Sequence, residues 1–351
     1  PISQGIGISM DVEDFVSTGV CSVTTQSYDK TTTLPQNFTV EDRQVSVEFS
    51  ISRNLSTRID EPPFTLESAM LFEFEPTNDY HFIYRLWYIA KQFLRYLCYR
   101  KNVFLPEAVL SAPADGGKFE TFATLYVLNE SGNEEIEILK SGHYIRQEYL
   151  AGAEGKLLTD IANETLYLRH LPQSYRSGRS IDASRFIMIM AAFEWEFRRC
   201  FPDGITKSAA TISAENAATA EIQKLLDCAD NRKERRLYQF LQRLVKSDSL
   251  ESEIIHTGKE LDAIIGVFGQ SLYRRNNQEL KYSEMGQRLS SQRNNYAHGN
   301  LDKEFIGLSL LDLMYMEYIL YAMQLNYYGM STTDIRHAIN DLFHLNCAID
   351  P

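Results

Sequence analysis

The stretch "IGLSLLDLMYMEYILYAMQLNYY", residues 306–328, decides the fold of the second half of this chain. When it is placed on a helix, Ile306–Tyr327 is apolar on nearly all sides. A helix at a protein surface shows one apolar stripe, whereas a helix that is apolar all round is enclosed by other elements. We therefore expect this segment to be the central buried helix of a bundle.

Helical spacing of apolar residues also dominates the chain before this stretch, from about residue 155 onward. Proline is nearly absent from this region. The segments that show the helical pattern are 157–171, 183–201, 215–229, 234–246, 258–275 and 282–299. Together they predict an all-α helical bundle that covers residues 153–351.

The N-terminal part has the patterns of strands. Alternation in "VSVEFSIS", residues 45–52, is typical of a half-buried strand, and residues 69–75 and 122–129 behave similarly. Residues 128–139 are expected to hold a turn between two strands, and "SAPADGG", residues 111–117, a loop.

One helix interrupts these strands. Asn78 or Asp79 can cap a run from Phe82 to Leu97 in which apolar residues recur at three- and four-residue steps. The chain is thus predicted to be an α+β protein of two domains. Residues 1–152 form a β-rich domain with one long helix, and residues 153–351 form the all-α domain.

The bulk composition narrows the classes of function. With 44% hydrophobic and 23% charged residues among 351, the chain is typical of a folded protein. No apolar run approaches the roughly twenty residues that span a bilayer, so we expect a cytoplasmic protein with no membrane partner. Five cysteines lie singly, and neither nucleotide-binding nor zinc-protease motifs occur. We expect no cofactor and no metal.

The candidate catalytic residues of the chain lie in "SQRNNYAHGN", residues 291–300. Arg293 and His298 are five positions apart, which on a regular helix turns their side chains about 140° away from each other. The two side chains can converge if the last turn unwinds, and Gly299 with Asn300 permits such a helix end.

Arginine and histidine provide the functional groups that are needed to cleave RNA without a metal. Arginine binds a phosphate through two donors, and histidine transfers protons near neutral pH. The ribose 2′-OH then attacks the adjacent phosphorus while a cation stabilises the charged transition state. Asn294 can orient the phosphate or the imidazole. Because one arginine and one histidine are few groups for this reaction, we favour a site that is assembled from two copies of the chain in a symmetric dimer.

"LSSQRNNYAHGN", residues 289–300, resembles the motif of HEPN-domain ribonucleases, in which an arginine, often followed by a polar residue, precedes a histidine. The order of a β-rich domain and a helical domain resembles ApeA-like anti-phage proteins. The resemblance implies that a HEPN-like domain, residues 153–351, cleaves RNA as a homodimer. It also implies that residues 1–152 sense a phage-derived trigger or restrain the nuclease, as in abortive infection.

The resemblance assigns roles to four residues. Arg293 matches the motif arginine, Asn294 the polar follower and His298 the motif histidine. Domains of this kind often add an acidic residue on an early helix, and the segment 191–199 offers Glu194 and Glu196. The order along the chain fits both carboxylates, and of the two we assign Glu194 to the site.

Simpler interpretations of these residues stay open. Arg293 and His298 also favour a helix C-terminus electrostatically, and Gly299 ends a helix. Residues 271–300 hold five basic against two acidic residues, which suits either RNA phosphates or a solvated face. The run "NRKERR", residues 231–236, is interpreted as a helix surface. The alternative function is a catalytically inactive HEPN-like protein that serves dimerisation, partner binding or regulation.

Overall fold

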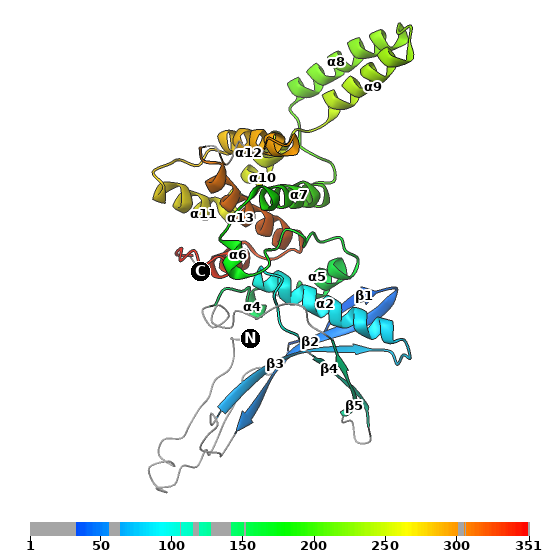
Figure 1. Cartoon of the computed structure of the whole chain (residues 1–351), viewed down its shortest axis with the longest axis vertical. Helices are drawn as coiled ribbons and strands as arrows, with labels where there is room; N and C mark the ends of the chain where they lie inside the picture. The colour runs from blue at the N-terminus through cyan, green and yellow to red at the C-terminus, as the bar shows by residue number, and fades with distance from the viewer. Residues whose placement is uncertain are drawn as a thin grey trace. The chain divides into compact units, whose positions relative to one another are not determined.

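The computed structural model describes residues 33–55, 64–105, 107–114, 119–127, 142–150, 152–300, 305 and 307–349. The chain divides into two compact units (Figure 1). Unit 1 is Pro1–Ile181 with Leu325–Pro351, and unit 2 is Asp182–Gln324. The boundary predicted after residue 152 falls inside unit 1, because the segment up to Ile181 and the C-terminal segment pack there. The α+β class, with a small β region near the N-terminus and a mostly helical remainder, matches the prediction.

Unit 1 contains an antiparallel three-stranded sheet in the order β1 (Gln36–Val40), β2 (Arg43–Leu55) and β3 (Phe64–Phe74). Val45, Val47 and Phe49 are buried on one face, which confirms the alternation predicted for this strand. Only two residues, Glu41 and Asp42, link β1 to β2, and both have positive φ. A turn of this type matches the right-handed twist of the two strands.

Helix α2 (Tyr80–Cys98) packs on this sheet (Figure 1). Asp79 caps it as predicted, because its Oδ1 accepts the backbone N–H groups of His81 at 3.0 Å and Phe82 at 3.3 Å. The Phe49 and Phe93 rings lie 5.6 Å apart across the interface. The apolar side of α2 is therefore the side that covers the sheet.

A second sheet is the antiparallel pair β4 (Glu107–Pro113) and β5 (Phe119–Tyr126). The loop predicted over residues 111–117 is wrong at Ser111–Pro113, which complete β4. A register shift after Leu110 lets the strand continue, and Pro113 stands at its end, where a missing N–H interrupts no further pairing. The strand predicted over residues 122–129 is found in β5 as far as Tyr126, whereas the turn and strands predicted over residues 128–139 lie outside the described residues.

The remaining helices of unit 1 are short. The helix predicted over residues 157–171 ends already at Ala162, because Glu164 adopts a left-handed φ of 57° that a helix does not tolerate. The described helices are α4 (Gln147–Leu150), α5 (Glu154–Ala162), α6 (Tyr175–Gly178) and α14 (Thr332–Leu342).

Among the described residues of unit 2, the regular secondary structure consists of helices and contains no strand. Its helices are α7 (Ala183–Cys200), α8 (Ala209–Asp227), α9 (Arg232–Lys246), α10 (Leu250–Glu260), α11 (Asp262–Arg275), α12 (Tyr282–Ala297) and most of α13 (Ser309–Tyr327). The helix predicted over 258–275 is divided at Leu261, a buried residue that ends α10 and begins α11.

Helix α13 is buried over most of its length, which confirms the prediction for the opening stretch of the sequence. It nevertheless carries four buried polar residues, Ser309, Asp312, Glu317 and Gln324. Arg185 of α7 donates to Glu317 at 2.6 Å, and Gln324 donates to a carboxylate of α7 at 3.1 Å. Because a buried polar group must find a partner, these bonds fix the register of α7 on α13.

Two glycines let α10 and α12 approach closely. A Cβ atom at Gly286 of α12 would lie 2.9 Å from the carbonyl oxygen of Glu251 of α10. A Cβ atom at Gly258 of α10 would overlap the ring of Tyr282 at the start of α12. The small residues therefore set the position of α12, the helix that ends in the Arg293–His298 segment.

We predict that Gly258→Ala lowers the free energy of unfolding by about 1–2 kcal/mol, because overpacking against Tyr282 outweighs the better helix propensity of alanine. Urea unfolding measures this loss. Lys259→Ala, at the exposed next position, is the matched control and is expected to change stability by less than about 0.5 kcal/mol. Equal stabilities of the two variants would contradict the close packing.

Candidate functional site

The candidate site lies at the end of α12. The helix stays regular up to its C-cap, since the His298 backbone N–H donates to the Asn294 carbonyl at 3.1 Å. The left-handed residue is Gly299, with a φ of 76°. The last turn therefore does not unwind before His298, so Arg293 and His298 do not converge within this helix. The expectation that unwinding brings them together is not met.

Arg293 pairs with a carboxylate of α7. Its Nη2 lies 3.4 Å from Oε1 of Glu194, while Oε2 of Glu194 lies 3.7 Å from Nη2 of Arg198. The Arg293 side chain is 42% exposed and that of Glu194 is 22% exposed. The guanidinium is thus held from one side and open to solvent on another.

Glu196, the other carboxylate that the sequence offered, has a different environment. It is fully buried, accepts from Arg199 at 2.6 Å and accepts from Gln324 at 3.1 Å. Its bonds hold α7 against α13. The structure therefore brings Glu194 to Arg293 and leaves Glu196 in the core.

Asn294 and His298 are both exposed at the helix end. Among the described residues, neither side chain forms a hydrogen bond or an ion pair. Between them along the chain, Tyr296 is buried, and its ring packs edge-on against Phe186 of α7 at 5.3 Å. The last turn of α12 is therefore anchored by Tyr296 while its polar side chains stay available to a ligand.

Glu253 of α10 is a further ionisable residue beside this site that the sequence did not indicate. Burial raises the pKa of its carboxyl to about 7, and the negative charges of Glu194 and Asp248 add to the shift, whereas Arg198 opposes it. Glu194 and Arg198 come from α7, which is distant in sequence, so no local motif marks Glu253. A carboxyl that titrates near neutral pH is suited to proton transfer.

Most cations of the basic segment 271–300 are neutralised. Arg288 lies 2.7 Å from Asp312, and Lys281 lies 3.2 Å from Glu284. Within the described ranges, Arg274 and Arg275 of α11 are exposed and have no carboxylate partner. The segment as a whole is therefore not an open basic surface.

The described residues contain no group of three or more His, Cys, Asp or Glu side chains that could hold a metal ion. None of the helices in the described part is long and apolar enough to cross a membrane. No family model, curated protein or solved structure was found to match the chain. The functional interpretation therefore depends on the residues and geometry of the site.

The raised pKa of Glu253 predicts a pH-dependent cost to stability. Because the folded pKa of about 7 exceeds the ordinary value of 4.5, the folded state binds the proton more tightly, and stability falls as pH rises through this window. We expect Glu253→Gln to raise the unfolding temperature by a few degrees above about pH 7 and to change it little near pH 4.5.

Thermal melts across this pH range test the prediction. Glu260→Gln, at an exposed position of the same helix, is the matched control and should follow the wild-type curve at every pH. A benefit of Glu253→Gln that does not depend on pH would show that the carboxyl does not titrate in this window.

Proposed function

We propose that this chain is a metal-independent endoribonuclease of the HEPN type that acts as a homodimer in the cytoplasm, in anti-phage defence by abortive infection. The observation that carries the proposal is the end of α12. There a half-exposed Arg293, held by Glu194, stands on the same helix end as the exposed Asn294 and His298. These are the groups that the ApeA-like resemblance requires.

Each side chain of the candidate site has a role in the proposed cleavage of RNA. Arg293 binds the scissile phosphate and stabilises the charge that develops when the ribose 2′-oxygen attacks phosphorus. His298 accepts the 2′ proton, and an acid donates a proton to the departing 5′-oxygen. Asn294 donates to a phosphate oxygen. Glu194 acts as a positioning residue, since it contacts the guanidinium of Arg293.

The regular helix end favours a site shared by two copies. Arg293 and His298 of one chain are turned about 140° apart, so they do not readily meet on one phosphate. Two helix ends related by a two-fold axis place the arginine of one copy near the histidine of the other.

The N-terminal part is proposed to sense a phage-derived trigger and to restrain the nuclease. The β4–β5 pair offers a surface for such a role, because several of its large apolar side chains are exposed. These are Val109, Phe119, Phe122 and Tyr126. Exposed apolar side chains gathered on one hairpin are suited to contact with another protein.

A specific observation favours the alternative, a catalytically inactive HEPN-like module for dimerisation or partner binding. The carboxylate of Glu194 pairs with Arg293, and Glu253 lies in the same charged cluster. Negative charges beside the guanidinium oppose the approach of a phosphate. In this alternative the Arg293–Glu194 pair would serve only to hold α12 on α7.

RNA cleavage by the purified protein distinguishes the two functions. With a chelator present, we expect the wild type to cut RNA, and His298→Ala or Arg293→Ala to reduce the rate by about 100-fold or more. His81→Ala and Arg198→Ala replace an exposed histidine and the other arginine on Glu194 and should leave the rate nearly unchanged. An inert wild type, or variants that cut equally well, would exclude the nuclease.

A mixing experiment tests the shared site. Arg293→Ala and His298→Ala chains, each inactive alone, are co-expressed so that mixed dimers form. Each mixed dimer then carries one intact pair, and the expected activity is about a quarter of the wild-type value for random pairing. Co-expression of two copies of the same variant is the control. No recovery in the mixture would place the arginine and histidine of one site on the same chain.

A further inference from the structure

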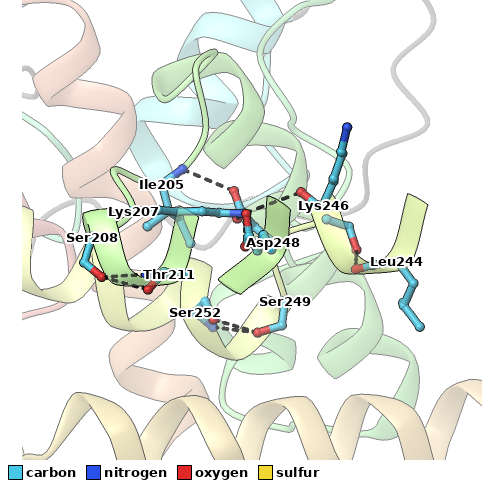
Figure 2. Close-up of polar contacts among 11 residues, drawn as sticks. Ile205, Lys207, Ser208, Thr211, Leu244, Lys246, Asp248, Ser249 and Ser252 are labelled. Carbon is cyan, nitrogen blue, oxygen red and sulfur yellow. Dashed lines mark hydrogen bonds and ion pairs between the residues drawn. The ribbon is translucent and has the colours of Figure 1, made fainter. Parts of the chain in front are cut away.

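Helices α8 and α9 form an antiparallel hairpin whose main contacts are with each other (Figure 1). Neither helix contains a buried residue. The base of the hairpin is fixed by Lys207, whose Nζ lies 2.8 Å from Glu215 of α8 and 3.1 Å from Asp248 beyond α9. Figure 2 shows Lys207 at Asp248, with the Ile205 backbone N–H donating to the same carboxylate. The hairpin is therefore an exposed but well-anchored element.

Helix α9 concentrates positive charge in a chain of net charge −12. It carries six basic residues and one acidic residue. Within the part of the chain that the structure describes, none of the six forms an ion pair, in contrast to Arg288, Arg293 and Lys281 of α12 and its N-cap. The six residues are Arg232, Lys233, Arg235, Arg236, Arg243 and Lys246.

The helix dipole explains only part of this charge. Arg243 and Lys246 lie in the last turn, where cations stabilise a helix. Arg232, Lys233 and the two arginines after Glu234 lie near the N-terminal end, where cations are unfavourable. Arg235 Nε donates to the Ala229 carbonyl at 3.4 Å, but among the described residues none of these four cations is paired with a carboxylate. A local arrangement that costs stability without a compensating ion pair is typical of a functional surface.

A polar groove lies between the two helices and continues this charge. It has a volume of about 480 Å³ and is lined by Thr219, Gln223, Gln242, Arg243, Lys246 and Ser247. Across it, Gln242 donates to Gln223 at 2.8 Å. The Thr219 hydroxyl is shielded from solvent and has no hydrogen-bond partner among the described residues. The groove thus combines two cations, amides and an unused hydroxyl, which are ligands for a phosphate.

We propose that the α8–α9 hairpin binds the phosphodiester backbone of single-stranded RNA, with one phosphate in the groove at Arg243 and Lys246 and others along the basic side of α9. The inference rests on the proposed ribonuclease function and names a docking surface for its substrate. Phe240 is 53% exposed on the same helix and offers an aromatic face to a base.

The shape of the surface favours RNA over a lipid bilayer. A helix that lies on a membrane turns an apolar face to the acyl chains and keeps its cations at the margins. Helix α9 exposes Leu237, Phe240 and Leu244, but two of its cations, Arg243 and Lys246, line a hollow between two helices, which fits a discrete phosphate group.

Binding is measured with a single-stranded RNA that carries 2′-O-methyl groups throughout, so that it cannot be cleaved through its 2′-oxygens. We expect the triple variant Arg236→Gln, Arg243→Gln, Lys246→Gln to weaken binding by at least tenfold at low salt. The slope of log affinity against log salt should fall by about 1.4, since the variant loses two phosphate contacts, one in the groove and one at Arg236, and each contact on a single strand is worth about 0.7.

Thr219→Val, which keeps the shape of the side chain, should weaken binding without changing the salt slope. The charge-matched control Lys156→Gln, Arg169→Gln, Lys259→Gln removes three exposed cations outside the α8–α9 hairpin and should bind nearly as the wild type does. Circular dichroism checks that every variant is folded. Unchanged affinity and slope in the α9 variant, or binding to phosphatidylserine vesicles without binding to RNA, would overturn the proposal.

Failure of the proposed RNA-binding surface can be distinguished from failure of the proposed ribonuclease activity. If the wild type cuts RNA and the α9 variant cuts with unchanged KM, the hairpin is not the docking surface although the enzyme assignment stands. If the hairpin binds the methylated RNA but no cleavage occurs in any condition, the docking surface stands and the ribonuclease fails.

Discussion

The buried carboxylate of Asp312 is the group on which the arrangement of unit 2 depends. It lies fully buried on α13 and receives Nε and Nη2 of Arg288 at 2.7 and 2.9 Å. The Tyr273 hydroxyl of α11 donates to it as well, and burial together with the Asp312 charge raises the pKa of that tyrosine. Removing Arg288 would leave the buried charge of Asp312 uncompensated, and removing Tyr273 would cost it a hydrogen bond, so α11, α12 and α13 are held in one register.

This constraint positions the candidate site. Arg288 and Arg293 are on the same helix, so the bond that fixes the first also fixes the direction of the turn that carries the second. On the other side, Arg185 bonds to Glu317, and Glu196 bonds to Gln324, which holds α7 where Glu194 meets Arg293. The Arg293–Glu194 pair itself is partly exposed and worth at most about 1 kcal/mol, so it follows from the packing and does not create it.

Positive charge is used in two different ways in the helical unit. In the bundle, the basic residues of α12 are matched to carboxylates and serve mainly to hold helices together. On α9 the cations are unmatched within the described residues, and two of them line a groove. An acidic protein with such a surface attracts anions to one place and repels them elsewhere, because field strength depends on the local distribution of charge and not on the net value.

Much of the secondary structure could be predicted from local pattern. Three features follow from residues that are close together in the sequence. They are the cap at Asp79, the alternation at Val45, Val47 and Phe49, and the apolar helix α13. The predicted helix bounds were wrong where tertiary packing or a local backbone conformation overrode the apolar periodicity of the sequence. Leu261 divides one apolar run into α10 and α11, and Glu164 ends a helix that the periodicity would have continued.

The sequence by itself determined the composition of the candidate site at the end of α12, because Arg293, Asn294 and His298 are close along the chain and need no tertiary contact to share a helix end. It left Glu194 and Glu196 undecided and gave no sign of Glu253. Only the tertiary structure decided these points, since the packing of α7 between α12 and α13 turns Glu194 outward to Arg293 and Glu196 into the core. A pKa near 7 for Glu253 likewise arises from burial and from charges that only folding brings together.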